Sequence, residues 1–63
     1  MIRIITEYSI CEGDTKRELI GSVNRAIRDG WEPFGNMVPY RYADDSTVWT
    51  QPIVKYDDDT FGD

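Results

Sequence analysis

The chain contains a single cysteine, Cys11, and no histidine, which limits how a sequence of 63 residues can be stabilised. A domain of this size buries only about 60% of the surface that its unfolded chain exposes, so its core is marginal. One cysteine cannot form an intrachain disulfide, and without histidine it cannot form a closed zinc site. We therefore expect no metal and no cofactor. We expect a homo-oligomer, a dimer or a tetramer, to supply the missing buried surface.

Charge and hydropathy limit the compartment in which the protein can work and the partners that it can bind. No apolar run approaches the ~18 residues of a membrane-spanning helix, and Glu7 interrupts the N-terminal run too early for a signal peptide. With the lone thiol, these features predict a cytoplasmic protein that does not enter a membrane. The net charge of −5 argues against binding to nucleic-acid backbones.

Acidic residues are concentrated at the C-terminus, at Asp57, Asp58, Asp59 and Asp63. In this segment only Phe61 offers an apolar anchor. We therefore expect one domain over residues 1–56 and a disordered acidic tail over residues 57–63.

The clearest predicted element is an amphipathic helix over residues 16–29. Thr15 and Glu18 have the spacing of a capping box, and Gly30 supplies a left-handed stop after the last turn. Between these signals, the apolar residues fall on one stripe at ~100° per residue. They are Leu19, Ile20, Val23, Ala26 and Ile27.

Three strands are predicted around this helix. β-branched residues indicate the first strand over residues 2–10, with Ile5 on one face and the other large apolar residues on the opposite face, at Ile2, Ile4, Tyr8 and Ile10. Residues 31–42 and 47–56 predict a hairpin whose turn is residues 43–46. The expected fold is α+β: a single βαββ domain with a three-stranded sheet and one helix packed on one face.

Apolar side chains occupy both faces of this predicted hairpin. Val48, Val54 and Tyr56 face one way, and Trp49 and Ile53 face the other. One helix covers only one face of a three-stranded sheet, so the second face requires another subunit. We expect the subunit interface to lie on the face opposite the helix and to contain Met37, Trp49 and Ile53.

Two segments carry a family resemblance, Gly30-Trp31-Glu32-Pro33-Phe34-Gly35 and Trp49-Thr50-Gln51-Pro52-Ile53-Val54-Lys55. They resemble the small bacterial and phage proteins classified as domain of unknown function 1737. The resemblance covers most of residues 2–56 and implies the same plan of strand, helix and hairpin, with no established activity. The sequence departs from the family pattern at Pro52, where the family has a residue able to donate a ladder hydrogen bond. Because proline favours edges and bulges, the place of the last strand in the sheet stays open.

Catalytic and phosphate-binding motifs are not found. Without histidine, Ser-His and Cys-His nucleophile pairs are excluded, and no glycine-rich phosphate loop is present. We expect no catalytic residues and no enzyme activity.

One constellation favours ligand binding. Arg17, Arg25 and Arg28 form a stripe on the helix face opposite the apolar residues, and guanidinium groups suit phosphate or carboxylate ligands. Aromatic residues offer stacking surfaces for a base. The candidate ligand-binding residues are Arg17, Arg25, Arg28, Trp31, Tyr40 and Trp49. The competing interpretation is a solvated helix face on which the arginines balance the helix C-terminus.

These residues give two hypotheses of function. The first is a small non-enzymatic protein, with phage-encoded sponge proteins as its analogy, that captures an anionic small molecule such as a nucleotide signal in a homo-oligomer. The second is a protein-interaction module or an inhibitor of a host protein, which would use the acidic tail or a hairpin edge.

Overall fold

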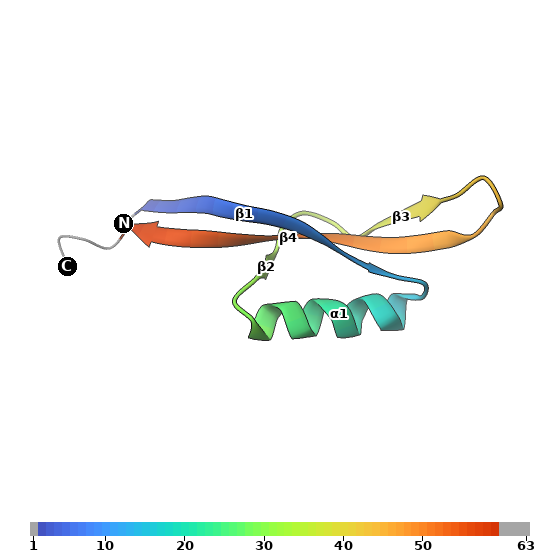
Figure 1. Ribbon diagram of the computed structural model, residues 1–63, viewed down its shortest axis with the longest axis horizontal. Coiled ribbons are helices and arrows are strands. Elements are labelled where there is room, and N and C mark those ends of the chain that lie inside the picture. The colour runs from blue at the N-terminus through green and yellow to red at the C-terminus, as the bar shows by residue number, and fades with distance from the viewer. Residues whose placement is uncertain (1, 60–63) are drawn as a thin grey trace.

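The structure is a computed structural model and describes residues 2–59. In chain order its elements are β1 (Ile2–Gly13), α1 (Lys16–Arg28), β2 (Glu32–Pro33), β3 (Val38–Arg41) and β4 (Thr47–Asp59). Every strand pair is antiparallel: β4 pairs with β1 along one edge and with β2 and β3 along the other. The α+β class with one helix is confirmed, and the sheet has four strands rather than the expected three (Figure 1).

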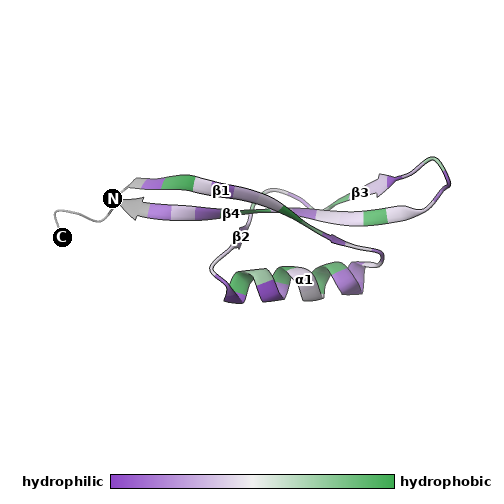
Figure 2. Ribbon diagram, in the orientation of Figure 1, coloured by the Kyte–Doolittle hydropathy of each residue, from purple (hydrophilic) through white to green (hydrophobic). Residues whose placement is uncertain are grey.

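Helix α1 begins and ends close to the signals found in the sequence. The Glu18 N–H donates to Thr15 Oγ1 at 3.1 Å, and the Asp14 N–H donates to Glu18 Oε1 at 3.0 Å, so two side chains satisfy two backbone donors. At the other end, Gly30 has a φ of 99° and its N–H donates to the Ile27 carbonyl at 3.1 Å. Figure 2 shows apolar and polar residues alternating around α1.

The second expected strand is broken into β2 and β3 by residues 34–37, which lie opposite Pro52. The Phe34 N–H donates to the Pro52 carbonyl at 2.9 Å, but proline has no N–H to return. Gly35 then turns the chain with a φ of 80°. The Gln51 side-chain amide donates to the carbonyls of Gly35 at 3.3 Å and Pro52 at 3.0 Å, and so holds the break together.

The same proline lies in the central strand of the sheet. In an extended strand, the N–H and C=O of one residue point to the same side. Since the Pro52 carbonyl points to the break, its missing donor also faces the break and removes no hydrogen bond from the ladder with β1. Proline is tolerated here because the neighbouring strand is interrupted at this point.

Strand β1 contains a bulge that reverses its faces. The register with β4 shifts between Ile5 and Glu7, which leaves Thr6 as the extra residue. Ile5, opposite Tyr56, therefore shares a face with Tyr8, opposite Val54. The prediction that Ile5 faces away from Tyr8 was wrong, because strict alternation does not cross a bulge.

Helix α1 packs on the sheet face that carries Trp49 and Ile53. The Lys16 ammonium lies 4.9 Å from the Trp49 ring, and Ile53 is almost fully buried. Met37 lines a groove with Leu19 of the helix. The assignment of Met37, Trp49 and Ile53 to the face opposite the helix was therefore wrong. The helix packs on this face because β1 presents small residues beneath it, at Ser9, Cys11 and Gly13.

The core is very small for a folded domain. Among the described residues, the buried apolar side chains are Leu19, Ile53 and Val54, which are 1%, 4% and 0% exposed. The molecule extends over 53 × 20 × 14 Å, with a radius of gyration of 14.4 Å. A compact chain of this length has a radius of gyration of about 11 Å. The single chain is therefore an elongated layer, and its own core is thin.

Hydrogen bonds hold the hairpin turn between β3 and β4. The Tyr42 N–H donates to the Ser46 carbonyl at 2.8 Å, and Asp45 adopts a left-handed φ of 69°. Two hydrogen bonds from Ser46 hold the pKa of the Asp44 carboxyl below its ordinary value. Strand β4 continues past the expected boundary at residue 56 to Asp59, opposite Ile2. The rest of the expected tail, Phe61 included, lies outside the described residues.

Two glycine substitutions should shift stability in opposite directions. A Cβ at Gly13 would lie 2.5 Å from the Leu19 backbone nitrogen, whereas a Cβ at Gly21 meets nothing within 4 Å. We expect Gly13→Ala to lower the free energy of unfolding by about 1–3 kcal/mol through overpacking. Gly21→Ala should raise it by about 1 kcal/mol through helix propensity. Urea unfolding of both variants measures this, and equal effects would contradict the close approach of α1 to β1.

Candidate functional site

The sheet face opposite α1 carries exposed apolar side chains, and no helix or strand of residues 2–59 packs on it. The register places Tyr8 of β1 and Val38 and Tyr40 of β3 on this face, with Ile10 beside Pro52. Tyr8, Ile10, Val38 and Tyr40 are 61%, 50%, 52% and 58% exposed. We call this surface the open face, and define it by Ile5, Tyr8, Ile10, Val38, Tyr40 and Val48. A contiguous apolar surface of this kind marks an interaction site on a folded domain.

The hairpin end of the open face is hollowed. The hollow has a volume of about 420 Å³, with Val48 and Thr50 of β4 and Glu12 of β1 in its lining. It lies between larger neighbours on the flanking strands, Ile10 of β1 and Tyr40 of β3. The Tyr40 and Tyr42 rings meet edge to face with their centroids 4.9 Å apart, which fixes one wall. The hollow exists because β4 carries short side chains where its neighbours carry long ones.

A polar bridge crosses β4 at the other end of the open face. Arg3 of β1 forms an ion pair with Glu32 of β2, and its guanidinium lies 3.8 Å from the centroid of the Tyr56 ring. Val54, which lies between β1 and β2 in the register, is fully buried beneath this end. Tyr8 stands next to Val54 as the most exposed large apolar side chain of the described residues. The open face therefore carries its most exposed large side chain, Tyr8, at one end, which we call the raised end, and the hollow over Val48 at the other, which we call the hollow end.

The helix side carries a smaller apolar groove. It has a volume of about 210 Å³ and runs between Ile20 of α1 and Met37 of the break between β2 and β3. Ile20 and Met37 are exposed, as are Ile27 and Phe34. Part of the apolar helix stripe expected from the sequence is therefore in solvent, because α1 sits towards β1 and leaves this flank open.

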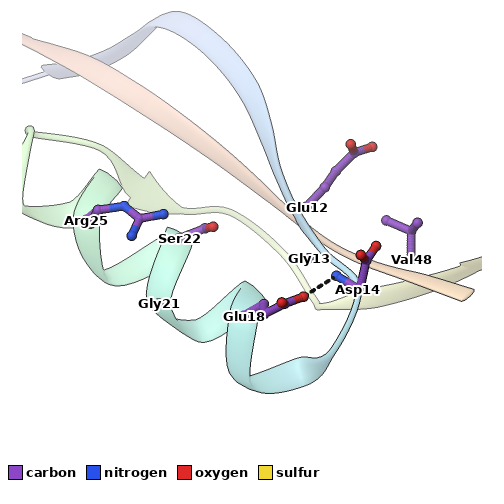
Figure 3. A pocket seen from close by; sticks show the side chains of 8 residues that line it. All are labelled: Glu12, Gly13, Asp14, Glu18, Gly21, Ser22, Arg25 and Val48. Carbon is purple, nitrogen blue, oxygen red and sulfur yellow. Dashed lines mark hydrogen bonds between the residues drawn. The ribbon is translucent and has the colours of Figure 1, made fainter.

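The arginine stripe borders a groove of mixed charge. Of the three candidate arginines, only Arg25 lines the groove of about 520 Å³ between α1 and the end of β1. Figure 3 shows Arg25 at one end of this groove and the carboxylates of Glu12, Asp14 and Glu18 towards the other. Three carboxylates outweigh one guanidinium, so the local charge does not favour an anion. Arg17 and Arg28 are exposed and do not line the groove.

The structure does not bring the candidate aromatic residues to these arginines. Trp31 follows the end of α1 and lies 4.8 Å from the Lys55 ammonium, whereas Trp49 lies by Lys16 at the helix start. Tyr40 is on the open face, across the sheet from the helix. The predicted ligand-binding set therefore falls into separate places rather than one pocket.

Sequence reasoning overlooked Tyr8 and Ile10 as surface residues, although a signal was present. On β1, Ser9, Cys11 and Gly13 alternate with Tyr8 and Ile10. A helix approaches a sheet most closely over small side chains, so this alternation indicates which face the helix takes.

No protein-family model matches this sequence, and no curated protein or solved structure matches it either. The resemblance to domain of unknown function 1737 therefore stays a prediction. In residues 2–59, no helix is long and apolar enough to cross a membrane. The same part of the chain holds no cluster of three or more histidine, cysteine, aspartate or glutamate side chains able to bind a metal.

Cys11 is expected to be a slow nucleophile. Burial raises the pKa of its thiol above the ordinary value of 9.0, and the Arg25 charge opposes this only in part. The pH profile of alkylation by iodoacetamide should therefore have its midpoint above pH 9.0, and Arg25→Ala should move it higher. Because the thiol pKa is higher in the folded chain than in the unfolded chain, the protonated thiol contributes stability that is fully present below pH 9.0. This contribution is lost as the pH rises through the thiol pKa of the folded protein. The urea-unfolded chain is the control, and a lower midpoint in the folded protein would contradict this view.

Proposed function

We propose that this chain is a non-enzymatic binding module that works as a homo-oligomer, with the open face as the contact between copies. The observation that supports this most directly is the open face itself, an apolar surface that no helix or strand of the described residues covers. A second copy brings the same surface and covers both at once.

The exposed area supports a second copy as the occupant. The accessible surface is 4891 Å², whereas a compact monomer of this mass exposes roughly 4,200 Å². Helix α1 stacks on the sheet along the 20 Å extent (Figure 1), so the extents of 53 and 14 Å give the opposite face a footprint on the order of 700 Å². A specific interface buries about 600–1,000 Å² on each partner, and this footprint lies within that range. The face is therefore large enough for a stable dimer.

Energetics point the same way. Among the described residues, only three apolar side chains are buried, which is a thin core for a chain that must offset the conformational entropy of folding. Burial of the open face would add Tyr8, Ile10, Val38 and Tyr40 to the core. Self-association then makes folding and assembly one process.

The mass of two matched variants tests this proposal. Ile10 on the open face and Ile20 on the helix flank are 50% and 56% exposed, so both accept a carboxylate equally well in a monomer. Ile10→Glu should strand a charge in the interface and weaken association at least tenfold, whereas Ile20→Glu should leave it unchanged. Light scattering after size-exclusion chromatography at micromolar concentration gives the mass.

Two outcomes would contradict the proposal. A wild-type chain that elutes with the 7.3 kDa mass of a monomer at all concentrations would end it, and would favour a host protein as the occupant. An assembly split by Ile20→Glu and not by Ile10→Glu would move the contact to the helix side.

Capture of an anionic small molecule is the weaker candidate, because the groove of about 520 Å³ that holds Arg25 also holds the carboxylates of Glu12, Asp14 and Glu18. A nucleotide present at a hundredfold excess over its dissociation constant would stabilise the fold by about 2.7 kcal/mol, a clear rise in Tm. We expect Arg25→Ala to abolish such a rise and Arg17→Ala, outside the groove, to retain it. No shift across a nucleotide panel would remove this candidate and leave the oligomer intact.

A further inference from the structure

The open face has a raised end and a hollow end at a fixed separation. Tyr8 lies opposite Val54 in the register, and the hollow lies over Val48. Val54 and Val48 lie six positions apart on β4, which corresponds to about 20 Å at the rise of an antiparallel strand. The residue midway between them on β4 is Gln51.

This layout is self-complementary under one symmetry operation. A twofold axis that crosses the strands at Gln51, in the plane between two facing sheets, exchanges the two ends of the face. It brings Tyr8 of each copy over Val48 of the other. The lateral offset between β1 and β4 is about 4.8 Å, and the ~30° angle between packed sheets accommodates it.

We propose that two copies pair in this antiparallel sense, with Tyr8 of each seated in the hollow over Val48 of the other. The inference rests on the homo-oligomer proposed above and specifies its geometry. It makes the contact isologous, because the same two features appear twice across the axis. Each Tyr8 ring loses its contact with water, and each Val48, which is half-buried in the single chain, is covered further.

The alternative twofold axis, parallel to the strands, leaves this shape unused. It places the raised ends of two copies together and the hollow ends together. Two facing hollows of about 420 Å³ would each hold about a dozen waters against Val48 and the Tyr40 ring. Raised ends in contact would also separate the sheets at Tyr8. Packing to the density of protein interiors therefore favours the crossing axis.

Pairwise cross-linking decides between the two axes. Tyr8→Cys and Val48→Cys are made separately, each with Cys11→Ser to remove the native thiol, and are mixed before mild oxidation. We expect a disulfide-linked dimer to form efficiently in the mixture and not in either variant alone, since position 8 of one copy meets only position 48 of the other. Each variant carries a single cysteine, so no disulfide within one chain can compete.

Other results overturn the arrangement. Cross-linking of Tyr8→Cys with itself would establish the parallel axis. If light scattering gives the mass of a dimer but none of the three samples cross-links, the contact between positions 8 and 48 is refuted. The homo-oligomer itself would then still be supported. If the wild type and all the variants have the mass of a monomer, both proposals are refuted.

A charge pair keeps the test decisive if a cysteine variant associates poorly. Tyr8→Lys and Val48→Glu should each weaken association at least tenfold. The double variant should recover most of it, because the introduced ammonium of one copy then meets the introduced carboxylate of the other. A double variant as weak as the single variants would contradict the arrangement. The dissociation constants come from sedimentation equilibrium.

Discussion

One helix cannot cover both faces of a sheet, and in this chain it covers only part of one. Helix α1 has 13 residues and is about 20 Å long, whereas the molecule extends over 53 Å. Its position is set by close contact with β1 at Gly13, where a Cβ would reach the helix backbone. That contact draws α1 towards β1 and leaves the flank at Ile20 and Met37 open. The open face stays bare because α1 lies on the other side of the sheet. The exposed surfaces follow from this one constraint.

The centre of the sheet shows how a difficult residue is accommodated. β4 pairs on both edges, and Pro52 lies in its middle. The missing donor faces the break between β2 and β3, where Gln51 supplies a side-chain donor instead. Ile53 and Val54 follow directly and are buried on opposite faces. The most buried part of the sheet therefore lies directly beside the point where the partner strand is interrupted.

Local signals in the sequence predicted the local structure well. The capping pair Thr15 and Glu18, the stop at Gly30 and the hairpin turn all lie where their chemistry places them. Each depends on hydrogen bonds between residues close in the chain, so the sequence alone contains the relevant partners.

Features that depend on distant partners were harder to predict. The bulge at Thr6 depends on pairing with β4, and the break opposite Pro52 depends on which strand becomes central. The assignment of Trp49 and Ile53 to the face opposite the helix was wrong because hairpin alternation shows that two faces differ, and not which one the helix covers. The row of small residues on β1 carries that information, through the packing distance that it permits.

The central claim is that a second copy completes this fold, and the concentration dependence of unfolding tests it most directly. If folding and pairing are coupled, the midpoint temperature of thermal unfolding rises with protein concentration. Each tenfold increase in concentration stabilises the folded dimer against unfolded monomers by about 1.4 kcal/mol per mole of dimer. The account predicts this rise over the micromolar range, with one cooperative transition. A midpoint that stays constant over a hundredfold change in concentration, in a chain that sediments as a monomer, would contradict it.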